Sequence, residues 1–214
     1  MTKNLLKRLF TSIVLSTVLL LCLFFNKYSW LILIILASII AFFEFNNLIK
    51  KIWKKKEISR YFFNTICFFY LLLFIFSANN LYNQGLELTL FILLVCTFSD
   101  IGGYTIGKNI GGKKLTKISP NKTISGCIGS FIFSLAPIFI YNVYDSNKYP
   151  ITIYMILISV FISLICQIGD LIISYFKRKA KIKDTGSVLP GHGGILDRID
   201  GILLGLPFGL LLLH

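Results

Sequence analysis

Charged residues are scarce in this sequence. Asp, Glu, Lys and Arg make up only 14% of its 214 residues, whereas soluble domains carry about 25%. The hydrophobic share is 56%, and the mean hydropathy is +0.78. Because the apolar residues come in long runs, the shortage of charge excludes a soluble domain with one membrane anchor. We therefore expect a single polytopic membrane domain over residues 1–214.

Acidic residues are scarcer still. Nine Asp and Glu stand against 22 Lys and Arg, which gives a net charge of +13. In a soluble protein this excess suggests nucleic-acid binding, but in a membrane protein basic residues collect in cytoplasmic loops. We therefore expect no nucleic-acid partner. The five cysteines lie in or beside apolar runs and form no CxxC pair, so we expect small core residues instead of disulfides or zinc ligands.

Several processing and catalytic signatures are missing. Lys3, Lys7 and Arg8 precede an apolar run, as in a signal peptide, but no small-residue cleavage site follows. We therefore expect a retained first helix. The sequence also lacks GxxxxGK[ST], HExxH and a Ser-His-Asp order. These absences leave a P-loop, a zinc hydrolase and a protein nucleophile without support.

What the chain does contain is a series of apolar segments. A membrane-spanning helix takes about 20 residues. We predict seven such helices, four in residues 1–99 and three in residues 100–214; they are Leu9–Phe25, Ser29–Phe45, Tyr61–Ser77, Leu86–Ser99, Ile124–Tyr141, Ile151–Ile168 and Asp197–Leu213. The N-terminus and every second connection hold 20 of the 22 Lys and Arg. This alternation predicts a cytoplasmic N-terminus and an external C-terminus.

Two of the cytoplasmic connections are more polar than topology requires. One is the Gly- and Lys-rich segment Ser99–Gly126, and the other follows Gly169. At 1.5 Å per residue, a helix from Asp197 to the C-terminus is roughly 27 Å long, so its first acids should lie near the headgroups. Asp170, Ser174 and Lys177 share one helix face by spacing. We therefore predict a polar pocket that opens to the cytoplasm at the level of the lipid phosphates.

The residue types in these segments suit phosphate and metal chemistry. Asp170, Asp197 and Asp200 offer carboxylate oxygens for Mg²⁺, although a helix cap or a solvated helix end would also explain them. Lysines and glycines favour phosphate, and "SPNKT" (Ser119–Thr123) opens a predicted helix, whose N-terminus favours the same anion. His192 either binds phosphate or holds its loop, and the sequence leaves both open.

The stretch Ser174–Asp200, "SYFKRKAKIKDTGSVLPGHGGILDRID", resembles the signature of the phosphatidate cytidylyltransferases, or CDP-diacylglycerol synthases. The family's upstream elements, roughly D-x-x-A-Y, G-K and S-P-x-K-T-x-E-G, are matched from Asp100 to Gly126. Two positions depart from that form: Gly103 stands for the usual Ala, and Ser125 for the usual Glu. The chain is also short for the family at its N-terminus.

The resemblance implies transfer of CMP from CTP to phosphatidate, which gives CDP-diacylglycerol and pyrophosphate without a covalent enzyme intermediate. It implies a Mg²⁺ site on Asp170, Asp197 and Asp200, leaves a second cation open, and adds Lys177 to the catalytic group. It implies substrate binding by a further set: Ser119, Lys122, Thr123, Arg178, Lys183, Asp184, His192, Gly193 and Asp100. It also implies a homodimer in the bacterial inner membrane with its active site facing the cytoplasm.

Other functions remain as alternatives. A CTP-dependent lipid kinase of the polyprenol type would need a base for its hydroxyl acceptor, and the basic and acidic run after Ser174 argues against it. CDP-alcohol phosphotransferases have a D-G…A-R…G…D…D arrangement that is absent here. A transporter of an anionic substrate should carry its polar groups near the bilayer midplane, whereas here they crowd one membrane face.

Overall fold

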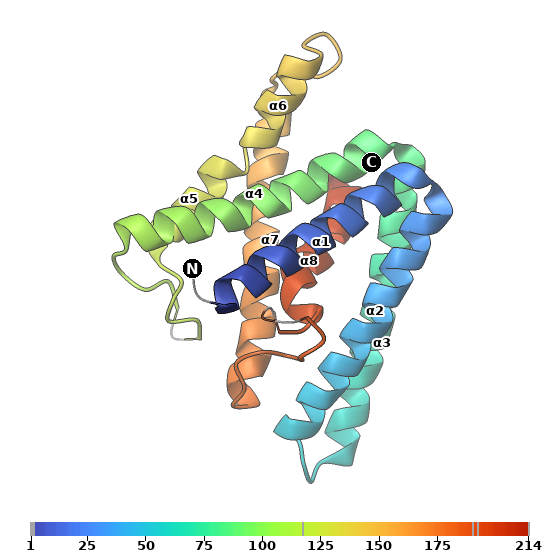
Figure 1. The fold of residues 1–214 in the computed structure, drawn as a ribbon, viewed down its shortest axis with the longest axis vertical. Helices are drawn as coiled ribbons and strands as arrows, with labels where there is room; N and C mark the ends of the chain where they lie inside the picture. The colour runs from blue at the N-terminus through green and yellow to red at the C-terminus, as the bar shows by residue number, and fades with distance from the viewer. Residues whose placement is uncertain (1–2, 117, 190, 192, 214) are drawn as a thin grey trace. The chain divides into compact units, whose positions relative to one another are not determined.

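The computed structural model describes residues 3–116, 118–189, 191 and 193–213, which fold as helices with two isolated β-bridges and no strand. The helices are α1 (Lys3–Phe25), α2 (Lys27–Ile52), α3 (Glu57–Gln84), α4 (Leu86–Ile110), α5 (Ile124–Phe133), α6 (Ala136–Tyr144), α7 (Ile153–Lys179) and α8 (Leu196–Leu213) (Figure 1). The chain divides into two compact units. The first unit comprises Met1–Leu86 and Phe176–Asp200, and the second comprises Glu87–Tyr175 and Gly201–His214.

The prediction of an all-helical protein with several helices apolar enough to span a membrane is confirmed for the described residues. Within the described residues, five helices are long and apolar enough to cross a bilayer: Lys27–Ile52, Glu57–Gln84, Leu86–Ile110, Ile124–Tyr144 and Ile153–Lys179. The apolar part of α1, Phe10–Phe25, is shorter, and α8 is not among the five. The predicted count of seven spans and the orientation stay predictions.

In the first unit, α2 and α3 lie side by side and are joined by a short turn (Figure 1). Asn26 and Ser29 form a capping box at the start of α2. The indole N–H of the buried Trp30 donates to the carbonyl of Ala78 on α3 at 3.1 Å. At the other end of the pair, the rings of Trp53 and Phe63 stack with centroids 4.4 Å apart. Aromatic and aliphatic packing therefore fixes α2, which carries one buried acid, Glu44.

In the second unit, α4 runs further than the sequence predicts. We expected the helix to end at Ser99 and a loop to begin at Asp100, and this is wrong: α4 continues to Ile110 and includes Asp100. The glycines beyond Asp100 do not end the helix, because they form its contact with α5. A Cβ on Gly102 would lie 2.4 Å from the carbonyl oxygen of Gly129. Small residues let membrane helices approach this closely.

The predicted segment Ile124–Tyr141 is helical but interrupted. It divides between α5 and α6 at Ser134 and Leu135, as Figure 1 shows. Pro137 lies in the first turn of α6, where its missing N–H is tolerated but a continuous helix is not. Just beyond α6, Lys148 donates to the carboxylate of Glu87 at 2.8 Å, and this hydrogen bond raises the pKa of Lys148 above its ordinary value.

The core of the second unit joins α4, α7 and α8. The hydroxyls of Ser99 and Ser163 are 2.8 Å apart. The thiols of Cys96 and Cys166 also meet, and a Cβ on Gly205 of α8 would lie 2.6 Å from the sulfur of Cys96. All five cysteines are free, as expected.

Candidate active site

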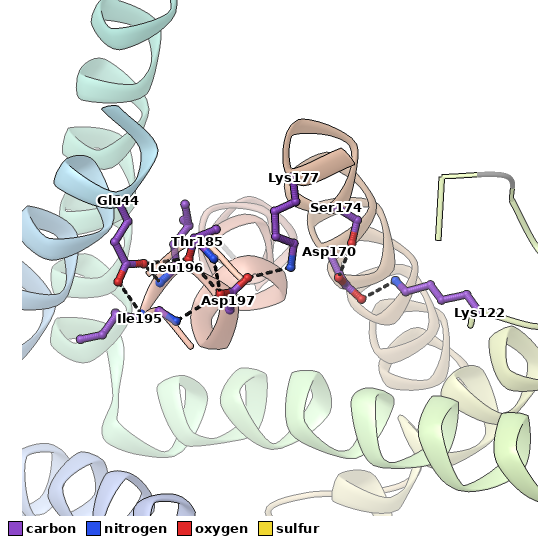
Figure 2. A network of polar contacts seen from close by, with 10 residues as sticks. Glu44, Lys122, Asp170, Ser174, Lys177, Thr185, Ile195, Leu196 and Asp197 are labelled. Carbon is purple, nitrogen blue, oxygen red and sulfur yellow. Dashed lines mark hydrogen bonds and ion pairs between the residues drawn. The ribbon is translucent and has the colours of Figure 1, made fainter. Parts of the chain in front are cut away.

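In the first unit, the predicted Lys177 and two residues that were not predicted for the site, Thr185 and Gly194, donate to the carboxylate of Asp197, whose side chain is only 5% exposed. Oδ1 accepts from the ammonium of Lys177 at 2.7 Å. Oδ2 accepts from the backbone N–H groups of Thr185 at 2.7 Å and Gly194 at 3.1 Å. The Thr185 hydroxyl lies 2.9 Å from the same oxygen (Figure 2). Asp197 therefore ties the end of α7 and the signature loop, residues 183–195, to the first turn of α8.

For Asp197 the sequence left a metal ligand and a helix cap open, and these contacts bear on the cap, while the metal ligand stays a prediction. An acid in the first turn of a helix is favoured by the helix dipole, and Asp197 does accept an N–H just before α8. The same carboxylate also holds a lysine cation and the loop backbone. A capping role alone would require neither contact.

Glu44 is a residue that the sequence analysis missed. Its carboxylate, on α2, accepts from the N–H groups of Ile195 at 3.0 Å and Leu196 at 2.9 Å, and from the Thr185 hydroxyl at 2.9 Å. Figure 2 shows the side chain pointing at these three residues. A signal was present, because Glu44 is the one acid in the predicted span Ser29–Phe45. An ionisable group inside an apolar helix needs a partner or a function.

The signature loop turns sharply just before Asp197. Gly193 has φ +83°, which lies in the left-handed region where a side chain is disfavoured. Its carbonyl accepts from the N–H of Leu189 at 3.0 Å. A Cβ on Gly193 would be 3.0 Å from Oδ2 of Asp197 and 3.0 Å from Cβ of Asp184. The predicted Gly193 and Asp184 are thus brought beside Asp197, and His192 lies outside the described residues.

The remaining predicted residues of the first unit lie close along the chain to the residues that contact Asp197. Arg178 and Lys183 have exposed side chains, and Asp200 is half-buried one turn of α8 beyond Asp197. Exposed cations suit contacts with anions in solution. The role of these residues in substrate binding stays a prediction.

In the second unit, a separate network forms around Asp170 on α7, whose side chain is 31% exposed. Its Oδ2 pairs with the ammonium of Lys122, and its Oδ1 accepts from the hydroxyl of Ser174 at 3.3 Å (Figure 2). The predicted pair of Asp170 and Ser174 on one helix face is confirmed, and Lys122 joins it.

Lys122 is presented by a short hairpin between α4 and α5. Lys114 and Thr123 form an antiparallel β-bridge. The N–H of Leu115 donates to the carbonyl of Lys122 at 2.8 Å, and the N–H of Lys122 donates to the carbonyl of Ser119 at 3.0 Å. The predicted Ser119, Lys122 and Thr123 therefore belong to one turn with defined backbone geometry, and Lys122 reaches Asp170 from it.

Thr123 and Ser125 link this hairpin to α5. The hydroxyl of Thr123 caps α5 by accepting from the N–H of Gly126 at 3.1 Å. Ser125, where the family form has Glu, lies 2.9 Å from the Thr123 hydroxyl and donates to the carbonyl of Gly111. The serine thus closes the connection onto the end of α4 by hydrogen bonding, without a negative charge.

The second departure also has a local explanation. A Cβ on Gly103 would lie 2.6 Å from the hydroxyl oxygen of Ser130 on α5. Ser130 therefore occupies the space that an alanine at position 103 would need. Asp100, one turn earlier on α4, is exposed, and its predicted contact with substrate stays a prediction.

The carboxylates of Asp170 and Asp197 are the candidate ligands for Mg²⁺. Within the described residues, no group of three or more His, Cys, Asp or Glu forms a metal-binding cluster. Magnesium is usually held by one or two carboxylates together with substrate phosphates. The carboxylates of Asp170 and Asp197 are hard oxygen donors, and each already holds a cationic lysine. As hard oxygen donors they fit such an ion, which would take the place of the lysine that each carboxylate now holds.

Comparison with known proteins gives a consistent result. The sequence model of the cytidylyltransferase family matches residues 48–214. A phosphatidate cytidylyltransferase of Bacillus subtilis is 40% identical over 144 residues, which are 67% of this chain and 52% of that protein. Those of Rickettsia bellii and Staphylococcus saprophyticus are 42% and 43% identical, over 63% and 58% of this chain and 60% and 48% of their own lengths. The chain thus spans about half the length of these relatives.

Proposed function

Because the chain belongs to the cytidylyltransferase family, we propose that it transfers CMP from CTP to phosphatidate, forming CDP-diacylglycerol and pyrophosphate. The relatives named phosphatidate cytidylyltransferase support this substrate pair. The observation that carries the proposal is the convergence of the signature on one buried carboxylate. Lys177, Thr185 and Gly194 all donate to Asp197.

In the proposed reaction, a phosphate oxygen of phosphatidate attacks the α-phosphorus of CTP. A new P–O bond forms as the bond to the β-phosphate oxygen breaks, and the electron pair leaves with pyrophosphate. Two anionic phosphates repel each other strongly at short range. The ammonium groups of Lys177 and Lys122 are each held beside a carboxylate. They would orient and neutralise phosphate oxygens of the substrates.

We assign the predicted Mg²⁺ ligands to Asp170, Asp197 and Asp200, with a second cation left open. When bound, the ion would offset negative charge on the triphosphate and on the leaving pyrophosphate. The protein's own part is to orient the carboxylates of Asp170 and Asp197 through the partners that each contacts. The three backbone and lysine donors on Asp197 favour the ionised form of that side chain.

The proposal includes an inner-membrane enzyme with seven spans, an active site that faces the cytoplasm, and a homodimer. The membrane location, the seven spans and the cytoplasmic active site are supported by the alternation of basic residues, with 20 of the 22 Lys and Arg in one set of connections, and by relatives that are bacterial. The homodimer rests on the family resemblance alone.

The reaction is tested with the purified full chain in sealed lipid vesicles, given labelled CTP and either phosphatidate or diacylglycerol. We expect labelled CDP-diacylglycerol and pyrophosphate from phosphatidate only, no turnover after EDTA, and no replacement of CTP by ATP. Because CTP does not cross a bilayer, only vesicles that expose the cytoplasmic face should be active. An Asp197→Asn preparation controls for a contaminating enzyme.

Two results would contradict the proposal. Phosphorylation of diacylglycerol, or equal use of ATP, would favour the lipid-kinase alternative. Activity confined to vesicles of the opposite orientation would contradict the assignment of the polar connections to the cytoplasm.

A further inference from the structure

Glu44 stands outside the part of the chain that identifies the family. The family match begins at residue 48, and the signature begins at Ser174. Glu44 nevertheless lies in the same unit as the signature loop and is 5% exposed. A carboxylate buried on an apolar helix is costly unless its oxygens are fully hydrogen-bonded. Within the described residues, the hydrogen-bond donors to Glu44 are Thr185, Ile195 and Leu196, all from the signature.

The contacts of Glu44 begin at the start of α8. A helix leaves its first N–H groups without intrahelical acceptors. Glu44 accepts two N–H groups there, from Ile195 at 3.0 Å and from Leu196 at 2.9 Å. Its negative charge also lies at the favourable end of the helix dipole. A side chain from α2 thus caps the start of α8.

Two glycines of the signature leave room for this carboxylate. A Cβ on Gly186 would lie 2.5 Å from Oε1 of Glu44, and a Cβ on Gly194 would lie 2.2 Å from Oε2. No real Cβ atom tolerates such distances, so either alanine would displace Glu44 or the loop. The glycines at these positions are therefore explained by the presence of Glu44, independently of its hydrogen bonds.

Thr185 connects Glu44 to the proposed catalytic carboxylate. Its hydroxyl lies 2.9 Å from an oxygen of Glu44 and 2.9 Å from an oxygen of Asp197, and its single proton can be donated to one of them at a time. Its backbone N–H remains on Asp197 at 2.7 Å. A shift of Glu44 would therefore move Thr185, and Thr185 would move Asp197.

On the basis of the proposed function, we propose that Glu44 is a positioning residue for the cytidylyl transfer. It holds the signature loop and the start of α8 so that Asp197 keeps its orientation, and it acts through Thr185 without touching substrate.

The test replaces Glu44 by Gln and by Ala in the full chain. A glutamine has one acceptor oxygen, so at least one of the two N–H groups, of Ile195 or Leu196, would face an N–H donor. We expect kcat to fall at least tenfold in Glu44→Gln, with the KM for CTP changed less than threefold. Glu57→Gln is the matched control, because Glu57 is an exposed glutamate paired with Arg60, and it should retain wild-type kcat.

Hydrogen exchange supplies a readout that does not depend on turnover. The amides of Thr185, Ile195 and Leu196 should exchange at least tenfold faster in Glu44→Gln than in the wild type. Amides in the α2–α3 pair should keep their rates, which separates local release of the loop from loss of the fold.

A double-mutant cycle supplies a second test, and Glu44→Gln with its exchange rates decides the inference where Glu44→Ala folds poorly. Gly186→Ala alone should lower kcat, because its new Cβ would displace the Glu44 carboxylate. Combining it with Glu44→Ala removes that clash, so the loss in the double variant should be much smaller than the product of the two single losses. Multiplicative losses would overturn the inference, because they would mean that the two sites act independently.

The outcomes separate this inference from the proposed function. Faster exchange with kcat unchanged would mean that Glu44 is only a structural anchor, and would overturn the positioning role. Unchanged exchange in Glu44→Gln would overturn the anchoring itself. If the wild type does not turn over CTP with phosphatidate, the proposed function fails, and the exchange rates still decide whether Glu44 holds the loop.

Discussion

The two carboxylates that we assign to Mg²⁺ have different surroundings. Asp197 is 5% exposed and receives a lysine and two backbone N–H groups. Asp170 is 31% exposed and contacts only side chains, those of Lys122 and Ser174, in the bonds that the structure defines. One carboxylate is built into a loop and a helix start, whereas the other projects from the middle of a long helix.

The difference indicates how the two groups would respond to change. Two of the partners of Asp197 are backbone N–H groups that cannot rotate away, so its orientation and the path of the loop depend on each other. The partners of Asp170 are a flexible lysine and a hydroxyl, which can exchange for water or another ligand at small cost. We therefore expect Asp197 to matter for structure and chemistry, and Asp170 for chemistry alone.

The largest effect is expected for Asp197→Asn. The amide would direct an N–H toward Lys177 or toward the loop N–H groups, so turnover should fall by about a thousandfold. The free energy of unfolding should also fall by about 2–3 kcal/mol, because buried donors lose their acceptor. Turnover and thermal unfolding in detergent measure the two effects. Loss of activity with an unchanged unfolding temperature would mean that Asp197, like Asp170, matters for chemistry alone.

A smaller effect is expected for Asp170→Asn. Turnover should fall by about a hundredfold as a charged ligand is lost, while the free energy of unfolding should fall by no more than about 1 kcal/mol, because the ion pair is partly accessible to water. The same two measurements apply. Destabilisation as large as that of Asp197→Asn would show that Asp170 is also part of the architecture.

The smallest effect is expected from a pair of glycine substitutions. Gly193→Ala and Gly111→Ala both introduce a side chain at positive φ, +83° and +64° respectively, which should cost about 1–2 kcal/mol each. Only the Cβ at Gly193 would press on Asp197, at 3.0 Å, whereas Gly111 has open space. We expect about a tenfold loss of kcat for Gly193→Ala and little change for Gly111→Ala. Equal kcat values for the two variants would show that the turn at Gly193 does not affect the function of Asp197.

Much of the fold follows from hydropathy, because all seven predicted segments are helical. The predicted helix bounds are wrong where the local residue composition favours one structure and tertiary packing favours another. Glycines after Asp100 suggest a loop by propensity, yet in α4 they allow contact with α5, and this tertiary gain outweighs their poor helix propensity. The break at Ser134 has no strong sequence signal apart from Pro137, which fits a helix start as well as a kink.

The site was predictable where a local pattern carried it. The i, i+4 spacing of Asp170 and Ser174 places them on one face, and the signature brings Asp184, Gly193 and Asp197 together. Long-range partners were not predictable from spacing. Lys122 meets Asp170 from 48 residues away, and Glu44 meets Leu196 from 152 residues away. A lone acid in an apolar helix indicates that a partner exists, but not which one.

The glycine contact between α4 and α5 affects the hairpin that carries Lys122. A Cβ on Gly126 would lie 2.7 Å from the carbonyl oxygen of Gly103, so the helices that flank the hairpin are held against each other at its base. A chain segment with fixed ends has already lost much of its conformational entropy. That loss occurs when the helices pack, before any anion arrives. We therefore expect the predicted anion binding at Lys122 to carry only a small ordering penalty, so that its strength would reflect charge and geometry.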